Sequence, residues 1–440
     1  MILSNAVIWT NDGKLIEKGW IKIDNGLITD VGEGTPSSAD LDLKGKLVLP
    51  GFVNLHSHLY SGLVRGMPLD VSPHSFLEIL EDIWWKLDLC LDEESVYYSA
   101  LVGGIESIKS GVTAIVDHHA SYGCVRGSLL LLKRALVDEL GMRADLCYEV
   151  SDRCGREKAE EAVEENLSFI ELSLKEGKGY FKAHFGLHAS FTLSDETLQA
   201  CVGSAPESIG FHIHLAEGSE DQRDSIEKYD LRAVERLDRW GILRRNTIVV
   251  HGIDLSADEK DILASRGVFF VHCPQSNMNN GVGTADLSSM FNRGIKVCLG
   301  NDGYGFNILN DLRVAFLLQK HEKRDFNAVS LKEVSDTLLR NNYKALESFW
   351  EGELKFGKIA PGYAADMIVI EYEPPTPFSA ENFLGHLIFG IADNIKVDKV
   401  MVGGKFLLDN GKVLNVDEEK VFSEARKVAE RLWKKVIEDA

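Results

Sequence analysis

Two histidines, His56 and His58, are the first residues of this 440-residue sequence whose type and spacing could do chemistry. They close an apolar run that begins at Phe52, directly after Pro50-Gly51, a pattern typical of a buried strand. Side chains two positions apart on a strand point to the same side. Both imidazoles therefore face one way at the carboxyl end of the strand, as the ligands of one metal ion must.

Similar residues follow later apolar runs. Nine of the 13 histidines lie at or near predicted strand ends: His56, His58, His118, His119, His188, His212, His214, His251 and His272. Glu217 comes three residues after His214, and Asp302 follows the last run in the segment GNDG. Random placement would not favour one rim of a fold, whereas convergence on one rim is what a metal-assisted hydrolase needs.

The elements that must position these residues alternate between strand-like and helix-like stretches. Candidate strands cover 52–56, 113–117, 143–150, 180–187, 210–215, 247–251, 268–272 and 295–300. Longer amphipathic segments separate them, which indicates βαβ units with parallel strands. Eight such units predict an α/β fold, a (β/α)₈ TIM barrel over residues 50–360, with its active site at the carboxyl ends of the strands.

Both ends of the chain have a different pattern of short strands and tight turns. Residues 1–49 and 361–416 share this pattern, and neither stretch can bury a good core alone. We therefore expect one small β-sandwich built from both chain ends, with the barrel inserted between them. Residues 417–440 form a C-terminal helical segment, with Asp417 as the N-cap, and we expect this helix to pack on the outside.

Composition limits the classes of partner. The formal net charge of -20 argues against nucleic acid or an anionic membrane surface as a partner. No apolar run reaches the ~18 residues of a membrane span, and the N-terminus lacks the basic region and cleavage site of an export signal. Seven cysteines without a CxxC pair suit a reducing cytoplasm better than a disulfide framework. We expect a cytoplasmic protein with a small-molecule substrate.

The motifs, in their order along the chain, resemble the metal-dependent amidohydrolase superfamily, in its deaminase/chlorohydrolase branch. The matching segments are PGFVNLHSH, HLAE, VVHG, HCPQSN and LGNDG, and together with the split sandwich they cover nearly the whole chain. The segments HSHLYSGLVRGM, VDHHAS and HCPQSNMNN are similar to the matching segments of the SsnA-type aminohydrolases. Those proteins occur beside selenium-dependent, xanthine-dehydrogenase-like hydroxylases. The motifs are highly specific for the superfamily and much less specific for a substrate.

The resemblance implies a mononuclear site that holds one divalent metal, Zn²⁺ or alternatively Fe²⁺. Its ligands would be His56, His58, His214 and Asp302. Glu217 matches the acid that moves protons, and Asp302 would take the proton of the attacking water. His251 matches the histidine beside that water, and in protonated form it would stabilise the developing charge.

Two points about the ligands rest on position. His212 points the same way as His214, so strand parity leaves both open, and the spacing to Glu217 within HLAE favours His214. Binuclear relatives carry a carboxylated lysine on the fourth strand. Here His188 stands at the end of that strand and Lys182 lies early in it, which favours a single metal.

The candidate substrate contacts are His188, His119, Arg65, Arg153 and Trp85. Only one of His118 and His119 can face inward, and His119 is slightly favoured. Either arginine could hold a carboxylate or a ring oxygen bidentately, or form a surface ion pair. Trp84 or Trp85 could stack on a flat ring, or pack in the core.

We therefore expect hydrolytic deamination of a purine-like or other nitrogen heterocycle, with release of ammonia. Cyclic-amide ring opening and displacement of halide are the alternatives on the same fold. A non-catalytic scaffold would have lost ligands, whereas every matched ligand and Glu217 are present. A homodimer is expected from the resemblance alone.

Overall fold

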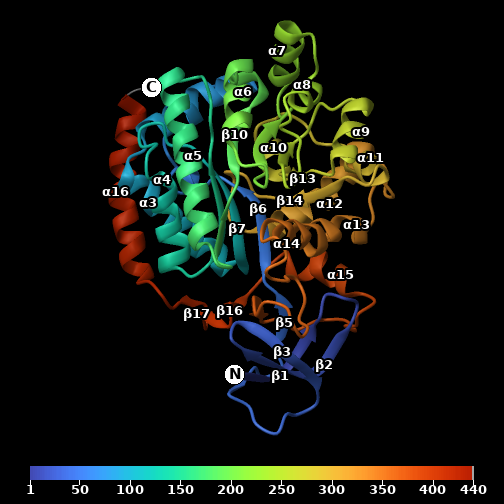
Figure 1. The fold of residues 1–440 in the computed structure, drawn as a ribbon. Helices are drawn as coiled ribbons and strands as arrows, with labels where there is room; N and C mark the ends of the chain where they lie inside the picture. Colours follow the sequence, from blue (N-terminus) through green and yellow to red (C-terminus); the bar gives the residue numbers. More distant parts are fainter. Residues whose placement is uncertain (439–440) are drawn as a thin grey trace.

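The computed structural model describes residues 1–438 and has a barrel of parallel strands standing on a smaller curled sheet (Figure 1). The barrel strands are β6 (Phe52–Ser57), β7 (Val112–His119), β8 (Arg143–Tyr148), β9 (Phe181–Ala183), β10 (Phe185–Ala189), β11 (Phe211–Leu215), β12 (Ile248–His251), β13 (Phe269–His272) and β14 (Lys296–Leu299). Each has a counterpart among the strands expected from the apolar runs. The fold class is therefore the predicted one.

Two parallel sheets, β6-β7-β8-β9 and β10-β11-β12-β13-β14, close the barrel. Bridges between Val150 and Leu187 and between Ser57 and Asp302 join them. The fourth predicted strand is broken at His184, where β9 pairs with β8 and β10 pairs with β11. At the break the buried His184 ring lies 2.8 Å from Asp145 and 2.9 Å from the carbonyl oxygen of Asn246.

Helices surround the barrel strands. They include α3 (Glu93–Lys109), α4 (Ser128–Lys133), α5 (Arg156–Glu176), α6 (Asp195–Ser204), α7 (Ser219–Tyr229), α8 (Ala233–Arg239), α9 (Ala257–Arg266), α10 (Pro274–Asn279), α11 (Leu287–Asn292), α12 (Ile308–Lys323), α13 (Leu331–Asp336) and α14 (Tyr343–Phe349). Further helical segments of up to six residues are η1 (Leu59–Leu63), α1 (Phe76–Ile79), η2 (Leu80–Trp84), α2 (Trp85–Cys90), η3 (Arg134–Glu139), η4 (Ser190–Thr192), η5 (Thr337–Asn342), α15 (Phe383–His386) and η6 (Leu387–Ile391). Side-chain caps define many of the starts: Asp92 accepts from the backbone of Ser95 at the start of α3, at 3.0 Å.

Both chain ends contribute to the curled sheet. Its strands are β1 (Ile2–Trp9), β2 (Leu15–Asp24), β3 (Leu27–Glu33), β4 (Leu41–Asp42), β5 (Leu47–Pro50), β15 (Met367–Ile370), β16 (Val397–Val402), β17 (Lys405–Asp409) and β18 (Lys412–Val413). The order is β18-β17-β16-β15-β5-β1-β2-β3, with β4 on β1, so the central antiparallel β5-β15 pair unites the two ends. The sheet curls over an apolar core that includes Ile8, Ile21 and Met367.

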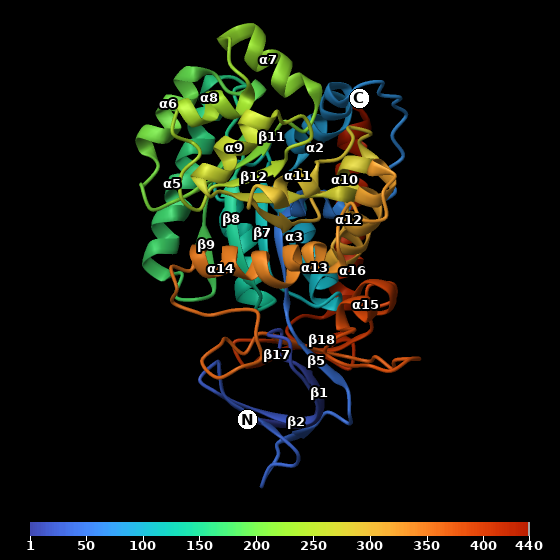
Figure 2. The same cartoon turned by 90° about the vertical axis from the view of Figure 1, so that its right-hand side faces the viewer.

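The barrel is fixed to this sheet by a buried ion pair and by the chain itself. Arg143 of β8 donates twice to Asp366, at 2.6 and 2.9 Å, and Asp366 also accepts from the backbone of Gly403. The chain passes from β5 through Gly51 directly into β6. The barrel strands therefore begin at the sheet, and their carboxyl ends lie at the far rim (Figure 2).

A long C-terminal helix, α16 (Glu418–Glu438), runs along the outside of the barrel beside α3 (Figure 1). Its apolar face is buried, and Asp417 accepts from the backbone of Lys420 at 3.1 Å, as the expected N-cap. Trp433 also donates to the carbonyl oxygen of Leu63, at 2.7 Å, which ties the helix to the segment after β6. Residues 439–440 of the expected segment lie outside the described residues.

Within residues 1–438, no helix combines the length and the apolar character needed to span a lipid bilayer.

Candidate active site

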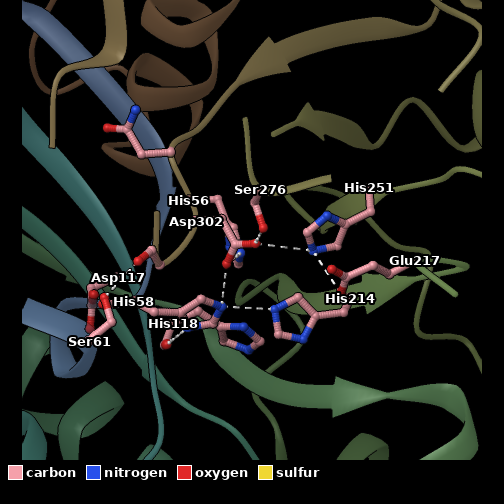
Figure 3. Close-up of polar contacts among 12 residues, drawn as sticks. His56, His58, Ser61, Asp117, His118, His214, Glu217, His251, Ser276 and Asp302 are labelled. Carbon is pink, nitrogen blue, oxygen red and sulfur yellow. Dashed lines mark hydrogen bonds and ion pairs between the residues drawn. The ribbon is translucent and has the colours of Figure 1, made fainter. Parts of the chain in front are cut away.

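His56 and His58 leave β6 on the same side, and Asp302 meets them from the end of β14 (Figure 3). Asp302 Oδ1 lies 3.5 Å from His56 Nε2 and 3.0 Å from His58 Nε2. The backbone of Asp302 has a φ of 60°, a conformation that costs about 1–3 kcal/mol in a non-glycine residue. Its amide donates to the carbonyl oxygen of His56 at 3.0 Å, so barrel closure holds the carboxylate in place.

His214, on β11, completes the group of histidines. Its Nε2 lies 3.1 Å from Nε2 of His58, too close for both nitrogens to face each other without a shared proton or cation. His56 Nε2 is buried and has no hydrogen-bond partner within residues 1–438. Donor atoms of His56, His58, His118 and His214 all lie within 4.8 Å of one another, and so do those of His56, His214, His251 and Asp302. His56 and His214 belong to both groups, and imidazoles with a carboxylate at this spacing fit a divalent metal.

The acid–base state of this group is set by burial and by the pairing of charges. Burial alone would lower the pKa of His58, but the hydrogen bond and charge of Asp302, with Glu149 and Asp117 nearby, raise it to about 9. Burial would raise the pKa of Asp302, yet His56 and His58 hold it well below its usual range. Asp302 is therefore a carboxylate that needs positive charge beside it, which a divalent cation supplies as well as protons do.

His251 and Glu217 face each other across the same space (Figure 3). His251 Nε2 lies 3.3 Å from Glu217 Oε2 and 4.0 Å from Asp302 Oδ2. Burial and the charge of Asp302 raise the pKa of Glu217 well above its usual range. Glu217 is therefore held as a protonated acid that can give up its proton.

The expected protonated state of His251 is corrected by its surroundings. Burial lowers the pKa of His251 to about 3. The amide of Asn277 donates to its Nδ1 at 2.9 Å, which makes Nδ1 an acceptor and leaves the single ring proton on Nε2. In this arrangement His251 is a neutral ring whose Nε2–H lies 3.3 Å from Glu217 and 4.0 Å from Asp302.

Two residues of the HCPQSN segment act on the site although no role was predicted for them. Both lie on α10, directly after β13: Asn277 binds His251, and the hydroxyl of Ser276 donates to Asp302 Oδ2. Asn280, one turn on from Ser276, donates to Glu217 at 3.2 Å. The available signal was the position of these polar residues immediately after a predicted barrel strand.

The preference for His119 as the inward-facing residue of its pair is wrong. His118 stacks on His212 at a centroid distance of 4.3 Å and contacts the rings of His56 and His214, so alternation along β7 turns His118 to the barrel axis. His119 instead binds the hydroxyl of Ser121 at 2.9 Å. His212 lies one layer below His214, and its Nε2 is 2.9 Å from Nδ1 of His56. In that place it orients the His56 ring.

A cavity of about 310 Å³ opens from the metal-type donors toward the outside. Tyr60, Trp85 and Phe306 give it aromatic walls, and the excursion that carries α1, η2 and α2 covers one side. His188 lines the cavity, with its Nδ1 2.8 Å from the hydroxyl of Thr192 and its ring edge-on to Trp85. A flat, largely apolar ring fits such a space.

The two candidate arginines also line this cavity but differ in setting. Arg65 sits at the rim with 70% of its side chain exposed, and it donates twice to Glu106, at 2.9 and 2.7 Å. Arg153 is buried and pairs with Asp88 of α2. Arg65 therefore matches the surface ion pair that was the alternative for it, whereas Arg153 remains a candidate for substrate contact. Lys182 lies away from the donors, in an ion pair with Glu353.

A barrel whose rim gathers four metal-type ligands, a protonated acid and a neutral imidazole is that of a metal-dependent hydrolase. The chain belongs to the amidohydrolase family, whose sequence profile matches residues 47–407. It is a hydrolase of carbon–nitrogen bonds, as the sequence predicts.

Curated relatives cover nearly the full chain. The chain is 33% identical over 423 residues to a 5'-deoxyadenosine deaminase of Methanobrevibacter smithii, with 94% of each chain covered. It is 31% identical over 437 residues to a 5-methylthioadenosine/S-adenosylhomocysteine deaminase of Pyrococcus furiosus, with 98% of this chain and all (100%) of the relative covered. Both relatives are deaminases, in agreement with the reaction class expected from the sequence.

Solved structures share the fold. An adenosine deaminase from Xanthomonas campestris with bound zinc superposes with a TM-score of 0.83 at 20% identity and covers 98% of both chains. The atrazine chlorohydrolase TrzN from Arthrobacter aurescens, complexed with zinc, has a TM-score of 0.81 at 21% identity, and the match covers 97% of this chain and 99% of that one. At these identities the likeness establishes the architecture.

Proposed function

We propose that this protein hydrolytically deaminates the adenine-type ring of a small nucleoside-like substrate, replacing the exocyclic amine by a carbonyl oxygen and releasing ammonia. One observation carries the proposal: Glu217 and Asp302 both lie within 4.0 Å of His251 Nε2, beside the histidine donors at the inner end of the cavity. The names of the full-length relatives support an adenine nucleoside as substrate.

The ligands of a single divalent metal would be His56, His58, His214 and Asp302, with Zn²⁺ as the first choice and Fe²⁺ as the alternative. The orphaned Nε2 of His56 and the facing nitrogens of His58 and His214 support this set. Bound there, the cation would supply a water of lowered pKa as the nucleophile. No sharp choice between the two metals follows from such ligands.

The protein groups supply the proton transfers. Asp302 Oδ2, positioned by the hydroxyl of Ser276, accepts a proton from the attacking water. Glu217 gives its proton to the ring nitrogen next to the reacting carbon, and the neutral Nε2–H of His251 donates to the oxygen that adds there. When the C–N bond breaks, the amine leaves with the bonding electron pair, takes the proton held by Asp302 and departs as ammonia. The added hydroxyl gives its remaining proton to the Glu217 carboxylate and becomes the carbonyl oxygen, so both carboxyl groups return to their starting states.

His188 and Trp85 would complete the substrate site. His188 lines the cavity beside the donors, and the indole of Trp85 stands edge-on to it at 6.3 Å. An imidazole nitrogen can meet a ring nitrogen of the substrate, while the indole covers the ring face. Both residues hold the ring where its C–NH₂ carbon meets the acid–base groups.

The compartment and the assembly belong to the same proposal. We place the protein in the cytoplasm, supported by seven cysteines that form no disulfide with one another within the described residues. The net charge of -20 supports a small-molecule substrate over nucleic acid. A homodimer is proposed from the family resemblance.

The test is an ammonia-release assay on metal-loaded protein. Adenosine, 5′-deoxyadenosine, 5′-methylthioadenosine and adenine form the panel, with a coupled enzyme reporting ammonia and Glu217→Gln as the inactive control. We expect ammonia from at least one nucleoside and a matching loss of adenine absorbance. If no member releases ammonia but a cyclic amide gains water, ring opening replaces deamination.

A further inference from the structure

The cavity wall carries more negative than positive side chains. Apart from histidines, the cations that line it within the described residues are Arg65 and Arg153. Five carboxyl groups line it as well: Asp88, Glu149, Glu217, Asp221 and Asp302. A divalent metal at the inner end would offset the acids there, but it does not reach the wall formed by α2 and the loop after β8.

Both cations are already neutralised by carboxylates. Arg65 is bound bidentately to Glu106 at the exposed rim. Arg153 is bound to Asp88 in the interior, where 7% of the arginine side chain and 2% of the aspartate side chain are exposed. The attraction between Arg153 and Asp88 is strong, because water screens charges little in the protein interior.

The interior pair is nevertheless only half satisfied. Arg153 Nε and Nη1 and Asp88 Oδ1 are buried and have no hydrogen-bond partner within the described chain. The guanidinium lies between aromatic rings, 5.2 Å from the centroid of Trp85 and 4.4 Å from that of Tyr122, so its position is fixed. Buried donors and acceptors of this kind cost free energy unless a ligand or water meets them.

Glu149 adds a further acid next to this pair. It is buried, and its Oε1 also lacks a hydrogen-bond partner in the described chain. Its carboxyl oxygens lie 3.4 Å from His58 Nδ1 and 3.9 Å from His188 Nε2. Glu149 therefore lies beside the metal-type donors and His188, and an anion placed at Arg153 would face the Asp88 carboxylate.

We propose that Asp88 and Arg153 form a charge-neutral recognition pair for an uncharged polar group of the substrate and exclude substrates that are anionic at that end. The free N–H groups of Arg153 meet an acceptor, and Asp88 Oδ1 meets a donor. A carboxylate in the same place competes with Asp88 for the guanidinium and faces the like charge of the Asp88 carboxylate. The inference rests on the proposed function, because it names the class of adenine compound that the site takes.

The test compares two ligands that differ in charge and hardly in shape, adenosine 5′-carboxamide and adenosine 5′-carboxylate. Binding to metal-loaded protein is measured by calorimetric titration at pH 8, and ammonia release is scored separately. We expect the wild type to bind the carboxamide at least ~10-fold more tightly, since like-charge placement in a buried site is costly. Asp88→Asn leaves Arg153 uncompensated and should shift this ratio toward the carboxylate by ~10-fold or more.

Glu106→Gln is the matched control, because it frees Arg65 in the same way at a solvated position and should leave the ratio unchanged. Arg153→Gln should weaken carboxamide binding without any gain for the carboxylate, and it serves if Asp88→Asn fails to fold in a melting check. Equal binding of both ligands by the wild type overturns the inference, as does an equal shift in Asp88→Asn and Glu106→Gln. A preserved binding preference without ammonia release would contradict the proposed deamination and leave the recognition pair standing.

Discussion

The side-chain amide of Asn277 lies 2.9 Å from Nδ1 of His251 and determines which nitrogen of that imidazole carries the proton. Because an amide N–H only donates, Nδ1 must accept, and the ring proton stays on Nε2, 3.3 Å from Glu217. A residue on α10 thereby sets which nitrogen of His251 carries the proton at the reacting end of the cavity. Its role is that of a positioning residue.

Replacing Asn277 by Asp should move that proton to Nδ1. The new carboxylate accepts from Nδ1–H, so the neutral ring presents a bare Nε2 to the site, and we expect kcat to fall by ~10²-fold or more, as for loss of a positioned donor. Metal content should not change. The measurement is kcat beside elemental analysis. Met278→Ala, at an exposed position of the same helix, is the control, and a similar loss in both variants would point to damage of α10 as a whole.

Replacing Glu217 by Gln separates proton transfer from metal binding. The side chain keeps its size and can still face His251, but it can no longer release a proton at the ring nitrogen. We expect metal content to be retained while kcat falls by at least ~10²-fold, the usual loss of a general acid–base. A variant that loses its metal would instead identify Glu217 as a ligand, and one with nearly full activity would identify it as a bystander.

The number of bound metals tests the ligand set. If His56, His58, His214 and Asp302 hold one ion, the purified protein should contain about one divalent metal per chain, and Asp302→Ala should contain far less. Asn301→Ala is the paired control, because it changes the neighbouring residue and leaves the four donors in place. Two tightly held metals would contradict the mononuclear site and would direct attention to the group of Glu149, His188 and His214, whose donor atoms also lie within 4.8 Å of one another.

The sequence predicts features that depend on a local apolar pattern and does not predict features that depend on contacts between distant residues. The barrel strands are readable because a buried parallel strand must be apolar along its whole length, and the run before His56 is an example. The break at His184 could not be predicted from the local pattern, and the His184 side chain there binds Asp145 and the backbone of Asn246, partners far apart in the sequence. Local pattern thus predicts elements, while long-range polar contacts interrupt them.

In the candidate site, too, local spacing predicts some positions and long-range contacts determine others. The spacing of His56 and His58 is enough to place both on one side of a strand. Strand alternation could not choose between His118 and His119, because it fixes that they point to opposite sides and not which side is the axis. The choice is made by the stacking of His118 on His212, a contact between β7 and β11. Asn277 was missed for a related reason, since it lies on α10 whereas its partner His251 lies at the end of β12.

Asp311 should make stability depend on pH. Burial raises its pKa to about 7, against hydrogen bonds from Gln275 and Asn301. Between the ordinary value of 3.8 and about 7 the folded state therefore binds more protons than the unfolded state. The free energy of unfolding falls as pH rises through this window, because the buried group must lose its proton. Urea unfolding at pH 5 and pH 7 should show a smaller fall in Asp311→Asn than in the wild type, and an equal fall in both would contradict the assignment.

The buried pair of Arg143 and Asp366 should contribute to stability asymmetrically. Both side chains are almost fully buried and joined at 2.6 and 2.9 Å across the contact between barrel and sheet. Asp366→Ala leaves the guanidinium buried without a counter-charge and also removes the acceptor for the Gly403 amide, so we expect a loss of roughly 3–5 kcal/mol in the free energy of unfolding.

The double replacement Arg143→Met with Asp366→Leu removes both charges and should lose less free energy of unfolding than Asp366→Ala. Urea titrations of the three proteins measure the difference, with Lys182→Met, which removes a cation from the partly exposed pair with Glu353, as the control. If the double variant is as unstable as the single one, shape and the backbone hydrogen bond, and not the uncompensated charge, determine the cost at this contact.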